Sequence, residues 1–270
     1  MTIELLLEKI NMSKTYAPKI MDAYKKWRAE NGAENCTNEN ARLLLTKPQT
    51  FANPELTISL LLFIAVEERN SGLWQRFPEE IFVNSMLVFT RSVDWAKEAV
   101  GYETYTKGPW PLLHASAKWF RLGELEFELN QENEKKEVHI HIPAKSRLTP
   151  EILKQTFKTE KAFMKEYFPD WADLTHSCES WMMSPCLKEL LPADSKILYF
   201  QSLFDIQKYT PTYRWCLEFV FNLEVFQQQN LDFHTLREDT SLQRAMKKYI
   251  LEGGNPGEAY GVLKTEIYED

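Results

Sequence analysis

Two neighbouring stretches alternate between apolar and polar side chains, and this alternation constrains the fold more than any other feature of the chain. The first is FRLGELEFEL at residues 120–129, and the second is VHIHIP at residues 138–143. Successive side chains of a strand point to opposite faces of a sheet. Each stretch therefore predicts a strand with one apolar face and one face of carboxylates or imidazoles.

The connection between the two stretches predicts which side chains face each other in a β-hairpin. The turn is expected at Asn133-Glu134. This turn sets Glu128 opposite His139, because the residues of antiparallel strands pair in register from the turn. Further from the turn, it sets Glu126 opposite His141. The polar face of the hairpin is thus suited to acid and base chemistry.

A basic loop leads from the second strand to the next predicted helix. It contains Lys145, Ser146 and Arg147. Thr149 and Pro150 follow at the positions of an N-cap and a first helical residue. Since a helix N-terminus presents backbone N–H groups to anions, the sequence predicts an anion site at this loop.

The composition is that of an acidic globular protein. Of 270 residues, 44% are hydrophobic and 26% are charged, and the formal net charge is −7. The length exceeds that of the usual single domain, so we expect two domains. Because no long block of Lys or Arg is present, the charge argues against nucleic acid as a partner.

The cysteines and the apolar segments predict a cytoplasmic protein with no membrane partner. The four cysteines are widely spaced and form no CxxC pair. This spacing favours reduced thiols over disulfides and argues against structural zinc. The longest apolar run, residues 56–66, predicts a buried helix, since a membrane-spanning helix needs roughly 20 apolar residues. The first residues carry carboxylates inside their apolar stretch, unlike a signal peptide.

The periodicity of the sequence changes near residue 112. Before it, helices are predicted at 18–31, 37–46, 54–70 and 78–100. After it, strands alternate with helices. Beyond the hairpin, strands are predicted at 176–183, 196–206, 213–221 and 259–267, and long helices at 150–168 and 241–251. The expected fold is α+β, with an N-terminal helical bundle (residues 1–112) and a mixed α/β domain (113–270) built on a central, largely antiparallel sheet.

A set of short segments resembles a known family. The segments are FRLGELEFE at 120–128, HIP at 141–143, LTPE at 148–151, CESW at 178–181, LPADS at 191–195, FQ at 200–201 and TSLQRA at 240–245. Together they resemble a bacterial family of acyltransferase-domain proteins, in which a helical N-terminal domain precedes a GNAT-like C-terminal domain. The resemblance implies that residues 113–270 are GNAT-like. It also implies that acetyl-CoA or another acyl-CoA is the co-substrate, and that no metal takes part.

The chain departs from the usual GNAT pattern at the cofactor pyrophosphate. GNAT enzymes hold this group on a glycine-rich Arg/Gln-x-x-Gly-x-Gly/Ala turn between a strand and a helix, and this sequence has no such string. We expect the loop at 143–151, which likewise joins a strand to a helix, to take the equivalent place. Its candidate cofactor-binding residues are Lys145, Ser146, Arg147 and Thr149.

The polar face of the hairpin supplies the candidate catalytic residues. His141 is the leading candidate for the base, because an imidazole titrates near neutral pH and can take a proton from an amine. Glu126 and Glu128 are alternatives that would act through an ordered water. The competing interpretation is an ordinary polar face on which Glu and His pair across strands.

Three further residues are candidates for substrate binding. His139 shares the polar face of the hairpin, and Ser180 and Trp181 lie in the short predicted strand at 176–183 that follows the helix. Cys178 precedes them, and we expect a buried structural thiol there, since a nucleophilic thiol needs a neighbouring base or helix N-terminus.

Two functions from different classes remain open. The first is a GNAT-type N-acyltransferase that moves an acyl group from acyl-CoA to a small-molecule amine or peptide by direct attack. The second is a non-catalytic small-molecule or protein-binding module that retains the GNAT-like fold, which the missing glycine-rich turn favours. The chain lacks GxxxxGK[ST], HExxH, GxSxG and a strand-linked GxGxxG. P-loop, zincin, α/β-hydrolase and Rossmann chemistry therefore lack their usual motifs.

Overall fold

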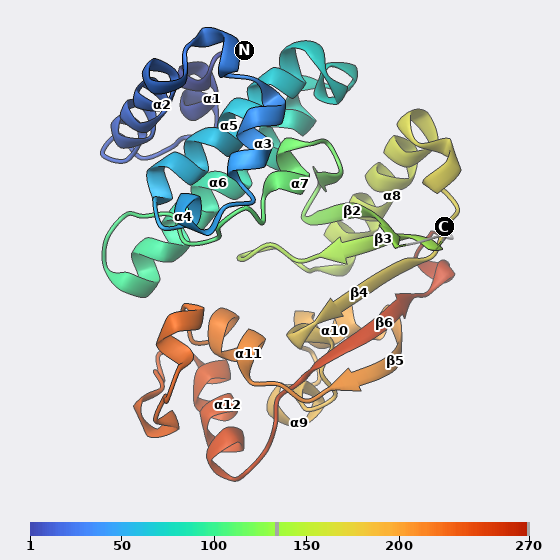
Figure 1. Ribbon diagram of the computed structural model, residues 1–270. Helices are drawn as coiled ribbons and strands as arrows, with labels where there is room; N and C mark the ends of the chain where they lie inside the picture. Colours follow the sequence, from blue (N-terminus) through green and yellow to red (C-terminus); the bar gives the residue numbers. More distant parts are fainter. Residues whose placement is uncertain (133–134, 269–270) are drawn as a thin grey trace. The chain divides into compact units, whose positions relative to one another are not determined.

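The computed structural model describes residues 1–132 and 135–268 and contains two compact units. The units are Met1–Arg121 and Leu122–Asp270 (Figure 1). The division falls within strand β1 (Trp119–Leu122). The division after residue 112 expected from the sequence stays a prediction, and the hairpin turn expected at Asn133-Glu134 lies outside the described residues. In the part of the chain that the structure covers, no helix is both long enough and apolar enough to cross a membrane.

The first unit is a helical bundle, as predicted. Its helices are α1 (Ile3–Lys9), α2 (Ala17–Asn31), η1 (Ala33–Asn35), α3 (Asn38–Leu44), α4 (Pro48–Phe51), α5 (Pro54–Ser71), η2 (Leu73–Arg76), α6 (Glu79–Val100) and α7 (Leu112–Ala115). The four predicted helices correspond to α2, α3, α5 and α6. Helix α1 was not predicted, and it begins where the Thr2 side chain accepts a hydrogen bond from the backbone N–H of Leu5.

Helix α5 forms the centre of this bundle. Every residue from Thr57 to Val66 is buried, which confirms the predicted buried helix. A helix that is buried on all sides has other elements packed around its whole circumference. On one side, Phe63 meets Trp27 of α2 edge to face, with ring centroids 5.2 Å apart.

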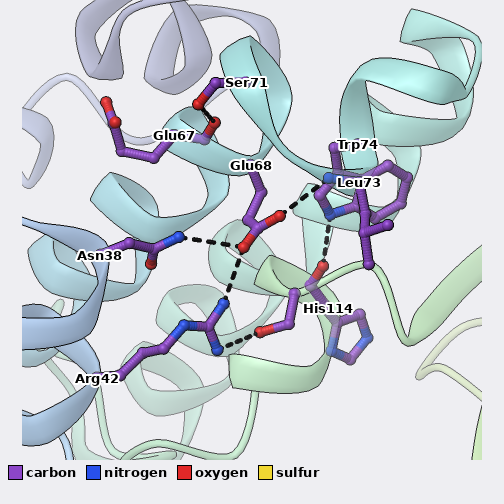
Figure 2. Close-up of polar contacts among 9 residues, drawn as sticks. Asn38, Arg42, Glu67, Glu68, Ser71, Leu73, Trp74 and His114 are labelled. Carbon is purple, nitrogen blue, oxygen red and sulfur yellow. Dashed lines mark hydrogen bonds and ion pairs between the residues drawn. The ribbon is translucent and has the colours of Figure 1, made fainter.

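A polar cluster joins α3 and α5 to η2 and to the end of α7 (Figure 2). The Arg42 guanidinium lies 3.1 Å from Glu68 Oε1 and donates a 2.8 Å hydrogen bond to Ser116 Oγ. Asn38 Nδ2 donates to Glu68 Oε1. The backbone N–H of Leu73 donates to Glu68 Oε2. The Glu68 side chain is only 16% exposed. These donors therefore replace the water molecules that would hydrogen-bond an exposed carboxylate.

The second unit is a mixed α/β domain, which confirms the predicted fold class. Its elements after β1 are β2 (Leu125–Glu132), β3 (Lys135–His141), α8 (Pro150–Tyr167), η3 (Pro169–Trp171), β4 (His176–Ser180), η4 (Trp181–Met183), α9 (Leu187–Leu190), α10 (Lys196–Ser202), β5 (Phe204–Thr210), α11 (Arg214–Phe219), η5 (Val225–Gln228), η6 (Phe233–Thr235), α12 (Ser241–Leu251), β6 (Glu258–Leu263) and η7 (Thr265–Tyr268). The strand order is β1-β2-β3-β4-β6-β5. β3 and β4 are parallel, whereas β2/β3, β4/β6 and β5/β6 are antiparallel.

The first predicted strand is in fact two strands. A tight turn at Gly123 and Glu124 separates β1 from β2. Gly123 has φ +61°, and a Cβ at this position would lie 2.5 Å from Thr156 Oγ1 of α8. The turn needs glycine both for its backbone conformation and for its close approach to α8.

Two other predicted strands are helical, one in its first part and the other over most of its length. Residues 196–202 form α10, which starts where Ser195 Oγ accepts a hydrogen bond from the backbone N–H of Ile197. Only the end of the predicted strand 196–206 belongs to β5. The stretch predicted as a strand at 213–221 contains α11, whose apolar side packs with α9 and α12 in a separate hydrophobic cluster. Tertiary packing overrides the strand propensity of its aromatic residues.

Helix α8 packs against the apolar face of the hairpin. Phe127 and Ile140 face each other across β2 and β3, and both are buried. Phe157 of α8 meets Phe127 edge to face at 6.2 Å between ring centroids. The same helix carries Glu160, which binds His176 Nε2 of β4 at 2.9 Å. The other face of the sheet carries the candidate site.

Candidate active site

The polar face of β2 and β3 carries the carboxylates and imidazoles that the alternation predicts. Glu128 lies opposite His139, and Glu126 lies opposite His141, which confirms the predicted register. The pairing follows from the alternation, because a shift by one residue would move the apolar side chains away from α8.

His141 forms a diagonal pair with Glu128. Its Nε2 lies 2.8 Å from Glu128 Oε2, and the side chains are 33% and 16% exposed, respectively. An ionised carboxylate can only accept a hydrogen bond, so the neutral imidazole carries its proton on Nε2 and its lone pair on Nδ1. Glu126, opposite His141 in register, is only 3% exposed. The arrangement pairs a partly exposed imidazole with a carboxylate on the polar face.

His139 forms a second pair, with Glu137 of the same strand. Its Nε2 lies 2.6 Å from Glu137 Oε1. Lys135 Nζ and the hydroxyl of Tyr260 on β6 each lie 3.1 Å from Glu137 Oε2. Burial alone raises the pKa of Glu137, but the hydrogen bonds from His139 and Lys135 outweigh it and hold that pKa below its ordinary value. Glu137 is therefore an ionised carboxylate that accepts from three donors.

Glu137 was missing from the predicted site, although the sequence contains the signal for it. It precedes His139 by two positions, so the same alternation places it on the polar face. No comparable signal in the sequence could pair it with Tyr260, which is far along the chain and reaches it through the strand order.

The parallel strands β3 and β4 separate next to these imidazoles. Among the described residues they pair at Val138 with His176 and at His139 with Ser177. β3 continues to His141 and β4 to Ser180 beyond the last pair, and Figure 1 shows the two strands diverging. In open sheets, ligands bind outside the carboxyl ends of parallel strands, where neighbouring strands lead apart.

The candidate residues Ser180 and Trp181 make structural contacts at the point where β4 ends and η4 begins, although the sequence predicted a strand through residue 183. Ser180 Oγ accepts a hydrogen bond from the backbone N–H of Met182, and Trp181 packs against the hydrophobic cluster around α11 and α12. Their role in substrate binding stays a prediction. Burial and the charge of Glu179 raise the pKa of the Cys178 thiol to about 12, so this thiol is un-ionised near neutral pH. Within residues 1–132 and 135–268, no group of three or more His, Cys, Asp or Glu side chains is arranged to hold a metal ion.

The basic loop is tied to the turn between β1 and β2. Arg147 Nη2 lies 2.6 Å from Glu124 Oε1, and Ser146 Oγ donates a 2.7 Å hydrogen bond to the backbone oxygen of Glu124. Lys145 is exposed and has φ +66°. These contacts fix the loop where it enters α8. The sequence predicted the loop but not its anchor, because Glu124 was assigned to a strand.

The N-terminus of α8 begins at Pro150, as predicted. Thr149 occupies the N-cap position, but its side chain accepts no hydrogen bond from the first turn, in contrast to the predicted cap. The backbone N–H groups of that turn are therefore not satisfied by Thr149. A helix N-terminus with this property is suited to an anionic group.

Comparison with known proteins identifies the fold of both units. Several solved acyltransferase structures are similar over 97% of this chain and 87% of their own. One is a complex with decanoyl-CoA and teicoplanin (17% identity, TM-score 0.76), and another is a complex with CoA and 10C-teicoplanin (18% identity, TM-score 0.78). A third is a mutant acyltransferase with octanoyl-CoA (17% identity, TM-score 0.75). No curated protein matched in the sequence search. The family described as GNAT-like C-terminal domain matches residues 119–263, which is more than half of the chain, and the protein belongs to this family.

Proposed function

We propose that this protein is an acyl-CoA-dependent N-acyltransferase, which transfers an acyl group to an amine by direct attack. The observation that carries the proposal is the His141–Glu128 pair at the end of β3, beside the point where β3 and β4 separate. Ligands bind at the carboxyl ends of parallel strands, and His141 lies at the carboxyl end of β3. The family membership and the acyltransferase fold support the same reaction.

The pyrophosphate of CoA would bind at the loop before α8. Lys145 and Arg147 supply positive charge, and Ser146 and Thr149 supply hydroxyls beside the helix N-terminus. Arg147 already contacts Glu124 through its guanidinium, so it would share its donors between that carboxylate and a phosphate. Backbone N–H groups of the first turn add donors that need no glycine-rich turn.

The reaction needs a base and no covalent enzyme intermediate. The amine nitrogen attacks the thioester carbonyl carbon, while the imidazole of His141 takes a proton from the nitrogen. The C–S bond then breaks, and its electron pair leaves with the sulfur of CoA. The imidazolium returns its proton to the thiolate, which restores the enzyme. Glu126 and Glu128 remain alternative bases through an ordered water, and a backbone amide would stabilise the oxyanion.

The acceptor class is a small-molecule amine or a peptide. Teicoplanin is present in solved complexes of similar fold, which supports an acceptor of this kind. Octanoyl-CoA and decanoyl-CoA are present in others, so medium-chain acyl-CoA should be tested together with acetyl-CoA. The four cysteines are free thiols, in keeping with the cytoplasmic location that we propose.

Two measurements test this function. A ligand that binds the native state raises the melting temperature by mass action, so decanoyl-CoA, acetyl-CoA and free CoA should each stabilise the protein. A panel of primary amines is then incubated with the stabilising acyl-CoA, and the amide products are measured by mass spectrometry. Amine-dependent products are expected. CoA binding without any product would favour the non-catalytic binding module, and no CoA binding would reject both the cofactor and the reaction.

A further inference from the structure

The carboxylate of Glu137 is held between three donors behind the imidazole of His139. Its side chain is 9% exposed, whereas the side chain of His139 is 30% exposed. Lys135 and Tyr260 both bind Oε2, and His139 binds Oε1. The carboxylate is therefore the more buried of the two groups, and the imidazole is the one that a ligand can reach.

This arrangement determines which ring nitrogen of His139 carries the proton. An ionised carboxylate accepts and cannot donate, so the 2.6 Å contact requires a proton on Nε2. The Asn130 amide nitrogen Nδ2 lies 3.2 Å from the same nitrogen. Because two donors cannot share a hydrogen bond, a proton on Nε2 requires the Asn130 amide to turn its oxygen toward the ring. In the neutral ring, the lone pair is then on Nδ1. No hydrogen bond to Nδ1 of His139 is present within the described residues.

We propose that Glu137 is a positioning residue that fixes His139 as the Nε2–H tautomer, so that Nδ1 accepts a hydrogen bond from the acceptor substrate. The inference rests on the proposed function, in which His141 takes the proton of the reacting amine. The two imidazoles lie on one face, with ring centroids 6.5 Å apart. His139 then binds a second donor of the acceptor beside the amine at His141.

The preferred acceptor follows from this spacing. It carries, besides its reacting amine, an N–H or O–H group a few bonds away, as in an amino alcohol or a diamine. A monofunctional alkylamine of the same size has no donor for His139 and should react less well. Discrimination by a site that hydrogen-bonds a substrate donor exceeds discrimination by size alone.

The tautomer is measured directly in the resting protein. Long-range ¹H–¹⁵N spectra of the histidine rings are recorded at about pH 9, well above the ordinary imidazole pKa of about 6.5. The chain has five histidines, and a His139→Gln variant assigns the relevant signal. We expect Nε2–H in the wild type and in Tyr260→Phe, and a mixture of tautomers in Glu137→Gln. An Nδ1–H signal from wild-type His139 would overturn the inference, whatever the protein catalyses.

The acceptor role is measured as a selectivity. The ratio of kcat/KM for 3-amino-1-propanol to that for n-butylamine, which has the same number of heavy atoms, should exceed one in the wild type. In Glu137→Gln it should fall by roughly 3-fold to 10-fold, the effect of one hydrogen bond. The matched control is Glu252→Gln, an exposed carboxylate at the C-cap of α12 that pairs with Lys248, which should leave the ratio unchanged.

The outcomes separate the inference from the proposed function. An unchanged ratio in Glu137→Gln, with both amines still reacting, would overturn the acceptor role of His139 and leave the acyltransferase intact. No reaction with any amine in the wild type would reject the proposed function and the acceptor role with it. A general structural defect in Glu137→Gln would lower kcat/KM for both amines alike, and this outcome also counts against the inference.

Discussion

Replacing His141 tests the proposed base. His141→Gln keeps a side chain that can donate a hydrogen bond to Glu128 but cannot take a proton near neutral pH. Loss of a general base lowers turnover by about 10²–10⁴-fold. At about 1.36 kcal/mol per factor of ten, this corresponds to roughly 2.7–5.4 kcal/mol in the activation free energy.

The cost to stability should be much smaller. The His141 side chain is 33% exposed, and partly exposed ion pairs contribute about 0–1 kcal/mol after screening by solvent. Activity and stability should therefore separate, with turnover falling by orders of magnitude and the melting temperature changing little. His141→Ala should give the same loss of turnover.

The assay measures amine-dependent release of CoA at saturating acyl-CoA, as a function of pH, for the wild type and both variants. The amine itself loses a proton as the pH rises, so rates are compared at equal pH, and the wild type should exceed both variants by about 10²–10⁴-fold. Acyl-CoA affinity should change little. A variant with wild-type turnover would refute the reasoning, as would a loss of turnover that only matches a loss of folded protein.

Two further predictions concern cofactor binding and stability. The double substitution Lys145→Ala and Arg147→Ala should weaken CoA binding by at least about 10-fold to 100-fold, the effect of one charged hydrogen bond, since it removes two cations. It should also reduce the salt dependence of CoA binding. Unchanged affinity by calorimetry would reject the loop, and Lys165→Ala at the other end of α8 is the control. Glu160→Ala should destabilise the protein by about 3–5 kcal/mol, because it leaves the buried His176 without its carboxylate partner. Urea unfolding measures this loss, and a change below about 1 kcal/mol would contradict a structural role for the pair.

The alternation of residues predicted the hairpin well because burial against α8 enforces it. Phe127 and Ile140 can face the helix only in one register, so the pairing of Glu128 with His139 follows from sequence. The diagonal contact of Glu128 with His141 does not follow, because it depends on side-chain rotamers and not on strand register.

Strands were wrongly predicted where backbone conformation or packing outweighed the local sequence pattern. Gly123 was assigned to a strand, but its positive φ and its approach to Thr156 make a turn. The aromatic residues of 213–221 suggested a strand, but the cluster with α9 and α12 accommodates them on a helix. Tyr260 could not be placed beside Glu137 from sequence, since that contact requires the order of strands in the sheet.

The proposed acyltransferase activity is tested most directly by comparing the amide products of the wild type with those of His141→Gln. Wild-type protein and His141→Gln are incubated with decanoyl-CoA and the amine panel, and the N-decanoyl products are measured by mass spectrometry with thermal shift as the control for cofactor binding. The proposal predicts amide products that depend on both protein and amine, at least about 100-fold fewer products with His141→Gln, and equal stabilisation of both proteins by decanoyl-CoA. Decanoyl-CoA that binds the wild type without producing any amide, or equal product from both proteins, would contradict it.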